Sequence, residues 1–169
     1  HRISVRGFTL LEPMIVILII GVVATSVVLS IGGRTLSDKL DIETRRMQQL
    51  FQLAQDEALF KRVELGFWTD GPNYGFITPA DGGEWAPYSQ SGPLRARRLD
   101  EPFEATLYVD DQRISPSDAA KPRPSVLILS SGEMTPFRLR LEAIGGEARS
   151  ELRGDGMGRT SLHTLESRR

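Results

Sequence analysis

The sequence contains no cysteine and only two histidines. The absence of cysteine excludes disulfide frameworks, thiolate metal sites and thiol catalysis. The formal net charge is −1, which gives no global reason to expect a nucleic acid or another acidic polymer as a partner. The composition is therefore poor in the groups that most enzymes use. We expect a protein that is not an enzyme and that has no cofactor and no metal site.

Continuous hydrophobicity is also scarce, except near the start of the chain. Residues 8–31 contain a single charged residue, Glu12, and residues 13–31 contain none. A helix of this length is roughly 36 Å long, enough to cross a hydrocarbon core of about 30 Å. We therefore predict a transmembrane helix over residues 8–31.

A buried core helix or a cleaved secretory signal peptide would also contain an apolar segment. A core helix normally carries a polar stripe, whereas residues 14–20 are apolar on every side. A signal peptide would end at small residues such as those at 24–26, but the apolar run continues beyond them through Leu29. A carboxylate near the start, Glu12, has no use in a signal peptide. The pattern favours a retained membrane anchor.

The charges that flank the apolar segment predict its orientation. Arg2 and Arg6 precede it without an acidic residue among them, while the downstream side mixes both signs. The positive-inside rule then places the N-terminus in the cytoplasm. We expect a single-pass protein of a bacterial inner membrane whose globular domain is periplasmic.

The residues at 6–12, Arg-Gly-Phe-Thr-Leu-Leu-Glu, followed by an apolar run, resemble the class III signal of type IV pilins and pseudopilins. In that family a prepilin peptidase in the membrane cuts after the glycine and methylates the new N-terminus. The resemblance implies a leader at 1–7, cleavage between Gly7 and Phe8, and N-methylation of Phe8. Glycine before the cut lets the backbone enter a narrow active site.

Glu12 lies four residues after Phe8, about one helical turn from the new terminal amine. A carboxylate at the bilayer centre costs about 2.5–3.5 kcal/mol, so an embedded acid is a functional candidate. The resemblance implies that Glu12 forms an assembly salt bridge with the terminal amine of a neighbouring subunit. The alternative is a glutamate that extends to the headgroups and interacts with the helix dipole. Pro13 departs from the family pattern and predicts a distorted first turn.

After Gly32 and Gly33, apolar residues return at helical spacing. This pattern predicts an amphipathic helix over residues 32–60 that continues into the periplasm, with Ser37 or Asp38 as a cap. Its polar face is expected to contain Arg45, Arg46, Gln48, Gln49, Gln52 and Gln55.

Residues 61–169 contain short β-prone runs separated by turn residues. We predict a hairpin that joins 63–68 to 74–77 around Asp-Gly-Pro-Asn at 70–73. Further strands are expected at 105–109, 125–129, 137–141, 148–153 and 160–164, with exposed loops at 79–93 and 110–124. The predicted fold class is α+β: a long N-terminal helix, first transmembrane and then amphipathic, packed on a β-rich globular domain of two antiparallel sheets, as in pilins.

Three segments narrow the resemblance: Asp-Glu-Ala at 56–58, Glu-Leu-Gly-Phe at 64–67 and Ser-Gly-Glu-Met-Thr-Pro-Phe at 131–137. They are similar to the H-type minor pseudopilins of type II secretion systems. The resemblance implies a structural subunit near the tip of the pseudopilus, which links the tip complex to the major pseudopilin and supports export of folded proteins across the outer membrane. Implied partners are other minor pseudopilins, the major pseudopilin, the prepilin peptidase, the inner-membrane assembly platform, exoproteins or the secretin, and the lipid bilayer before assembly.

Two alternatives remain open: a minor pilin of a type IV pilus, in pilus assembly or DNA uptake, and a signal-anchored periplasmic enzyme. The arginines at 95–98 and near the C-terminus favour DNA only weakly, because acids are interleaved with the second group, and we expect no nucleic-acid partner. A hydrolase triad of Ser161, His163 and Asp155 lacks the Gly-x-Ser-x-Gly elbow. We expect residues 154–158, which are rich in glycine, to form a turn.

Overall fold

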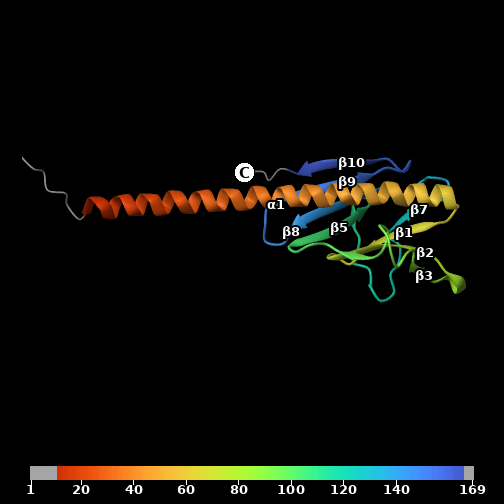
Figure 1. The fold of residues 1–169 in the computed structure, drawn as a ribbon. Coiled ribbons are helices and arrows are strands. Elements are labelled where there is room, and N and C mark those ends of the chain that lie inside the picture. Colours follow the sequence, from red (N-terminus) through yellow and green to blue (C-terminus); the bar gives the residue numbers. More distant parts are fainter. Residues whose placement is uncertain (1–10, 166–169) are drawn as a thin grey trace, which may run out of the picture. The chain divides into compact units, whose positions relative to one another are not determined.

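The computed structural model describes residues 11–165, with the side chains of 11–12, 24–34 and 164 left out. The chain divides into two units, His1–Leu36 and Ser37–Arg169. A single long helix, a short 3₁₀ helix and ten short β-strands make up the described elements (Figure 1). The strands all belong to the second unit, and so does the helical part that packs on them.

Helix α1 extends over Leu11–Lys61 and confirms the predicted long helix within the described residues. Pro13 lies within α1, as the structure describes it. The helix includes Gly32 and Gly33. The cap expected at Ser37 or Asp38 is wrong, because both residues lie inside a continuous helix, where the N–H groups that a cap would bind already bond to carbonyls of the preceding turn.

One stripe of the Ser37–Lys61 part of α1 is buried. Its members alternate at spacings of four and three residues, which keeps them on one face of a helix. They are Leu40, Thr44, Met47, Phe51, Ala54 and Ala58, each at most 1% exposed. The one hydroxyl in the stripe is satisfied within the helix, since Thr44 Oγ1 donates to the Leu40 carbonyl at 2.7 Å. The stripe is therefore fully compatible with an apolar core.

The first sheet is antiparallel, with strand order β3-β2-β1-β7 and β4 paired to β2. The predicted hairpin is present, and Phe67 pairs with Phe76 across it. Two short strands, β3 and β4, were missed, and β3 with a 3₁₀ turn occupies part of the loop expected at 79–93. The bounds are β1 Leu65–Thr69, β2 Asn73–Pro79, β3 Trp85–Pro87, β4 Arg97–Arg98 and β7 Val126–Ile128, with the turn at Asp81–Gly83.

The second sheet is also antiparallel, with strand order β10-β9-β8-β5-β6. Its central strand β8 alternates between buried and half-buried residues, as the sequence predicts. The four longer strands confirm their predictions, whereas β6 is a short addition within the loop expected at 110–124. The bounds are β5 Phe103–Val109, β6 Gln112–Arg113, β8 Phe137–Ala143, β9 Arg149–Gly154 and β10 Thr160–Leu165.

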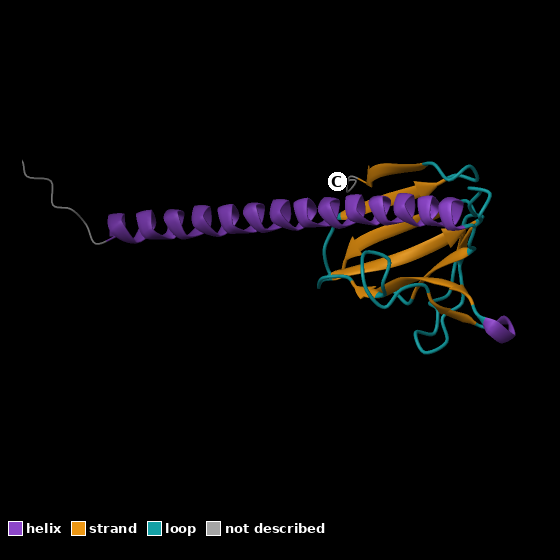
Figure 2. Ribbon diagram, turned by 45° about the vertical axis from the view of Figure 1, so that its right-hand side comes forward, coloured by secondary structure: helices purple, strands orange, loops and turns teal. Residues whose placement is uncertain are grey.

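The Phe51 ring is the point where α1 meets both sheets. Its centroid lies 4.8 Å from that of Phe67 and 5.6 Å from that of Phe76, in the first sheet. It also stacks on Phe137 of the second sheet at 4.5 Å. The helix residues from Ser37 onward cross the strands on one side of the β-structure (Figure 2). The core of the second unit is thus a three-way junction centred on one aromatic side chain.

Replacing Phe51 by alanine should lower the free energy of unfolding by about 3–5 kcal/mol, because the cavity borders three other rings and cannot collapse easily. Denaturant unfolding of the detergent-extracted chain, followed by tryptophan fluorescence, measures the change. Phe60→Ala is the matched control, since Phe60 lies on the same helix but is 88% exposed. Similar losses in the two variants would contradict the central role of Phe51.

Candidate functional site

The residues predicted for processing and assembly lie at the edge of what the structure describes. Gly7 and Phe8 fall outside the described residues. Glu12 is the second residue of α1, and its side chain is not described. Cleavage, N-methylation and the assembly salt bridge therefore stay predictions.

The next part of α1, residues 13–23, exposes every side chain. Eight of its nine large apolar side chains from Met14 to Val23 are at least half exposed, such as Ile17 at 69%, while Ile15 is 47% exposed. A contiguous apolar surface of this kind indicates a protein or membrane interaction site. The predicted transmembrane segment, 8–31, extends beyond the residues whose side chains are described.

No helix built from the described residues has the combination of length and apolarity that a membrane crossing requires.

Two glutamines attach α1 to the β-structure. Gln48 Nε2 donates to the Thr160 carbonyl at 3.1 Å, and Gln55 Nε2 donates to the Gly132 carbonyl at 2.8 Å. Gly158 has a φ of +79°, and a Cβ there would meet the Gln55 amide, so this close approach needs glycine. Both glutamines were expected on the polar face of the helix. Each is half-buried and donates to a backbone carbonyl of a loop or strand end, contacts that the sequence did not predict.

The last turn of α1 is tied to the segment after β3. Glu57 and Lys61 form an ion pair at 2.5 Å, and the Tyr88 hydroxyl donates to Glu57 while it accepts from Lys61 Nζ at 3.2 Å. The hydrogen bonds from Lys61 and then Tyr88 lower the pKa of Glu57, and the same contact with Glu57 raises the pKa of Lys61. All three groups stay in the charge state that this cluster needs at neutral pH.

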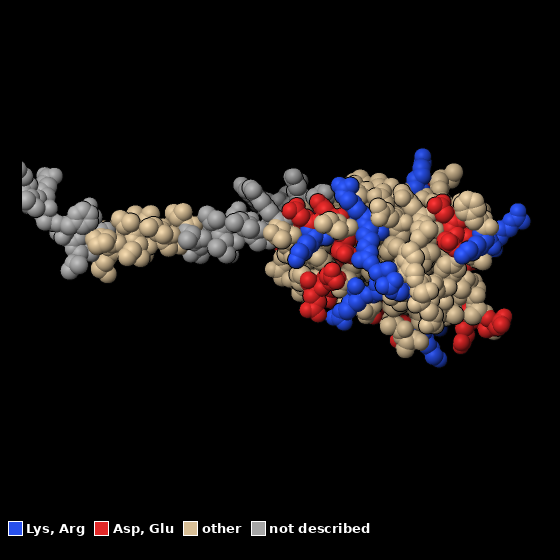
Figure 3. Space-filling model, viewed as in Figure 1, with Lys and Arg blue, Asp and Glu red and all other residues tan. Residues whose placement is uncertain are grey.

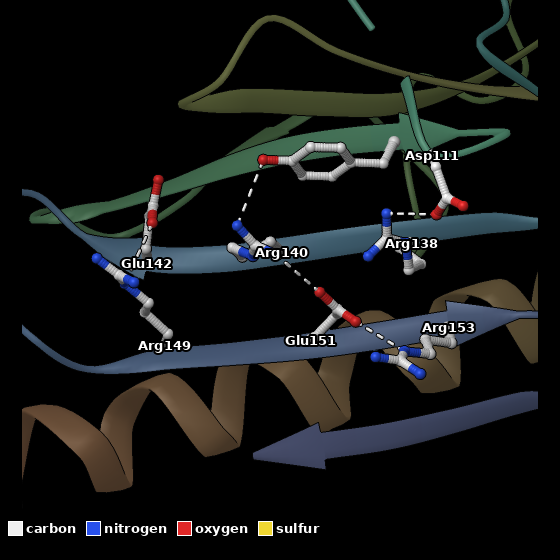
Figure 4. Close-up of polar contacts among 8 residues, drawn as sticks. Asp111, Arg138, Arg140, Glu142, Arg149, Glu151 and Arg153 are labelled. Carbon is white, nitrogen blue, oxygen red and sulfur yellow. Dashed lines mark hydrogen bonds and ion pairs between the residues drawn. The ribbon is translucent and has the colours of Figure 1, made fainter. Parts of the chain in front are cut away.

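A network of charged side chains covers the outward face of the second sheet (Figure 4). At its centre the Glu151 carboxylate, 1% exposed, accepts from Arg153 Nε at 2.7 Å and from Arg140 Nη2 at 3.3 Å. Arg140 also lies over the Tyr108 ring, 5.0 Å from its centroid, and Arg138 binds Asp111 at 2.7 Å. The side chains of β8 that point the other way are core residues, so the network lies opposite α1.

Burial alone would raise the pKa of Glu151, but the hydrogen bonds and charges of Arg153 and Arg140 outweigh burial and lower it. Glu151 is therefore an ionised, fully paired group. Because Arg140 on β8 and Glu151 on β9 face each other, this contact holds the two strands in register.

The triad considered from the sequence does not form. Ser161 Oγ lies 3.2 Å from His163 Nε2, on the exposed β10. Asp155 instead binds the Arg159 side chain at 2.9 Å and accepts backbone N–H groups of the turn that joins β9 and β10. Glu151, directly across from His163, forms ion pairs with two arginines.

The glycine-rich segment 154–158 is part of the turn that joins β9 and β10, as predicted. No group of three His, Asp or Glu residues that could bind a metal is found within the described part of the chain.

One set of charges was missed because it depends on the fold. Arg46 on α1 and Arg97 on β4 lie close enough to influence each other, although both were expected on separate solvated surfaces. The sequence shows the arginine-rich stretch at 95–98, but it gives no indication that Arg46 of α1 lies near this stretch.

Comparison with protein families gives two matches within the chain. The family described as "Type II transport protein GspH" matches residues 43–158, and the "Prokaryotic N-terminal methylation motif" matches residues 2–31. The first covers α1 from Glu43 and nearly all of both sheets. The second covers the predicted cleavage site, Glu12 and the apolar segment.

Individual relatives agree with this assignment. The chain is 35% identical over 161 residues to type II secretion system protein H of Pseudomonas aeruginosa, covering 89% of this chain and 91% of the relative. It is 29% identical to the Aeromonas hydrophila protein H, covering 96% and 94%. The minor pseudopilin EpsH of the Vibrio cholerae type 2 secretion system has the same fold, with a TM-score of 0.64, 21% identity, and coverage of 79% of this chain and 99% of EpsH.

The family is one of structural subunits of the secretion system and not of enzymes, which agrees with the absence of a triad among the described residues. Three observations lead to one assignment. They are the two-sheet domain packed on a long helix, the methylation motif ahead of it, and the match across residues 43–158. The chain therefore belongs to the GspH family of type II secretion pseudopilins.

Proposed function

We propose that the chain is a minor pseudopilin located near the tip of the pseudopilus, where it links the tip complex to the major pseudopilin. In this position it supports export of folded proteins across the outer membrane. The observation that carries the proposal is the order of the two matches in one chain: the methylation motif at 2–31 precedes the GspH match at 43–158. The first defines a pilin-type subunit, and the second defines which type.

Processing at the N-terminus precedes assembly in this proposal. The prepilin peptidase cuts between Gly7 and Phe8 and methylates the Phe8 amine. Cleavage there leaves the whole apolar segment on the mature chain, so the product keeps its membrane anchor. Glu12 then pairs with the terminal amine of a neighbouring subunit, which compensates its charge as the helix leaves the lipid.

The apolar part of α1 has two successive environments in this proposal. Before assembly it anchors the chain in the inner membrane, with the N-terminus in the cytoplasm and Ser37–Arg169 in the periplasm. After assembly it packs among the helices of neighbouring pseudopilins. The exposure of all side chains over residues 13–23 supports both, because lipid and a helix bundle each cover an apolar helix on every side.

The partners follow from this cycle. Other pseudopilins of the system are partners of any type II secretion pseudopilin. We add the prepilin peptidase and the inner-membrane assembly platform, which act before and during assembly, and exoproteins or the secretin at the tip. The surfaces that distinguish one partner from another lie on the Ser37–Arg169 unit.

Mass analysis of the membrane-extracted protein should show a mature chain that begins at Phe8 and carries one added methyl group. A chain that begins at Val27 would instead indicate signal-peptide cleavage after the small residues at 24–26 and would contradict a pilin-type subunit. A Gly7→Leu variant should remain unprocessed, because a side chain there obstructs the narrow peptidase site.

Replacing Glu12 by alanine should leave membrane insertion intact, since the change only increases apolarity. Removing one partner of a buried ion pair costs about 3–5 kcal/mol, so incorporation into sheared pseudopili should fall at least tenfold. Asp56→Ala is the control, because Asp56 lies on the same helix, is exposed and is outside the apolar part. An unchanged level of incorporation would refute the role of Glu12.

Deleting the protein should abolish release of exoproteins and leave natural transformation unaffected. Secreted enzyme activity in the culture medium and transformant counts measure the two outcomes in the same strain. The reverse result would favour the DNA-uptake branch of minor pilins.

A further inference from the structure

A groove of about 830 Å³ lies on the first sheet, and both tryptophans of the chain line it. Phe67 of β1 contacts Phe51 of α1, so its strand neighbour Trp68 points to the opposite face of the sheet. The groove is therefore on the side of the sheet that faces away from α1. Two segments form its walls. We name residues 80–93, which contain the 3₁₀ turn and β3, the arm, and residues 117–124 the strap.

The arm and the strap meet over Gly66 of β1. A Cβ at this position would collide with Cβ of Pro124 in the strap and would lie 3.2 Å from Cζ3 of Trp85 in the arm. Glycine leaves room for both side chains. On the same face, Trp68 is 5% exposed and Ile77 of β2, which pairs with Gly66, is 1% exposed. The arm and the strap thus cover an apolar surface of the first sheet that α1 does not reach.

The strap is attached to β1 at both ends. The Ser117 N–H donates to the Thr69 carbonyl at 2.9 Å, and the N–H of Ser125, the residue after the strap, donates to the Phe67 carbonyl at 2.8 Å. The Arg123 N–H also donates to Ser117 Oγ at 3.1 Å, which closes the strap on itself. The strap is therefore the fixed wall of the groove.

The arm has fewer attachments. Its strand β3 forms three residue pairs with β2 and has no strand on its other side within the described part of the chain. The Tyr88 N–H donates to the Phe76 carbonyl at 2.9 Å. Beyond Tyr88, no backbone-to-backbone hydrogen bond of residues 89–93 is found among the described residues. Short edge elements of this kind open locally at a small fraction of the free energy of global unfolding.

Glycines at positive φ lie toward both ends of the arm. Gly82 and Gly83 have φ values of +86° and +81° in the 3₁₀ turn, and Gly92 has +76°. All three are exposed, and an added Cβ would meet nothing within 4 Å. The turn projects from the edge of the first sheet (Figure 2). Because such positions absorb backbone changes readily, the arm is the movable wall of the groove.

One side chain of the arm connects it to the end of α1. The Tyr88 hydroxyl donates to Glu57 Oε2 at 2.5 Å and accepts from Lys61 Nζ at 3.2 Å. Lys61 Nζ also lies 5.7 Å from the centroid of the Tyr88 ring and pairs with Glu57. Figure 3 shows acidic and basic side chains side by side over the end of the unit where α1 ends. We name Glu57, Lys61 and Tyr88 the latch.

We propose that the arm is a movable cover over the apolar groove and that the latch holds it closed. In the closed position Trp85 lies against Gly66, as the structure shows. Opening breaks the β2–β3 ladder and the latch, while the strap and both sheets keep their contacts. The opened surface presents Trp68 and Ile77 to solvent.

The cover couples two distant surfaces of the Ser37–Arg169 unit. The latch joins the arm to the last turns of α1, whereas the groove lies on the face of the first sheet away from α1. The end of α1 therefore determines access to a surface that the helix itself does not touch. All of these contacts lie within one unit, so the cover does not depend on the proposed function.

The charge of Glu57 makes the latch sensitive to acid. Lys61 on α1 and Tyr88 on the arm are the titratable groups that face Glu57 in the described part of the chain, and their hydrogen bonds lower the pKa of Glu57. Because this pKa is depressed in the closed state, the latch is complete at neutral pH. Its stabilising effect is lost as the pH falls through the lowered pKa of Glu57.

Tyr88→Phe tests the latch, because it removes the hydroxyl and keeps the ring beside Lys61. Amide hydrogen exchange of the full chain in detergent, read by mass spectrometry, should become about tenfold faster at β3 and Tyr88, since hydrogen bonds to charged groups are lost. The amides of β1 should keep their rates. Tyr108→Phe is the matched control, because the Tyr108 hydroxyl accepts from Arg140 Nη1 at 3.4 Å on the other sheet. It should leave the arm unchanged.

Glu57→Gln tests the acid sensitivity. Acrylamide quenching of the two tryptophans reports on the groove, because both line it. In the unaltered chain we expect quenching to rise as the pH falls through the lowered pKa of Glu57. In Glu57→Gln it should already be raised at neutral pH and should not change over the same range, because no carboxylate is left to protonate.

Three results would overturn the proposed cover. The first is unchanged exchange of the arm in Tyr88→Phe. The second is an equal acceleration of the arm and of β1, which would mean that the whole unit opens together. The third is an acceleration of the arm by Tyr108→Phe as large as that by Tyr88→Phe. Quenching with the same pH dependence in Glu57→Gln and in the unaltered chain would exclude Glu57 from the latch.

Discussion

The burial of one helical stripe between two sheets is the constraint on which the rest of the Ser37–Arg169 unit depends. A helix in water gains most of its stability from tertiary packing, and here that packing centres on the Phe51 ring, which contacts phenylalanines of both sheets. Gln48 and Gln55 then satisfy carbonyls of a strand end and of a loop that the packing brings close. The Glu57–Lys61–Tyr88 contacts fix the last turn. These polar contacts are possible only because the stripe fixes the rotation of the helix.

The same helix has opposite requirements in its two parts. From Leu40 onward it buries one face and leaves the others in water, whereas residues 13–23 expose apolar side chains all round. A single regular backbone thus carries two different side-chain patterns. The charged network around Glu151 lies on the solvent-facing surface of the second sheet. It makes the outward face of the second sheet polar, which discourages unselective hydrophobic contact there.

Much of the fold was predictable because its signals are local. The helical spacing after Gly33, the Asp-Gly turn between β1 and β2 and the alternation of β8 are all contained in short windows. The short strands β3, β4 and β6 were missed because two or three residues carry no period, and their pairing depends on distant strands. The hydrogen bonds of Gln48 and Gln55 were not predicted for the same reason, since their acceptors lie far away in the sequence. Gly7, Phe8 and Glu12 came from a motif, and the structure does not describe their side chains, so they stay predictions.

The Phe51 junction also determines how the unit responds to mechanical load. The helix continues into the β-structure only through a few residues after Lys61, among them Arg62 at a φ of 54°. A force along the Ser37–Lys61 axis does not act mainly on that connection. It is shared by the side chains of the buried stripe, which resist sliding because they are close-packed and Phe51 contacts rings of both sheets. Displacing the helix by one turn would require the aromatic cluster to unpack, so the helix and both sheets move as one body under load.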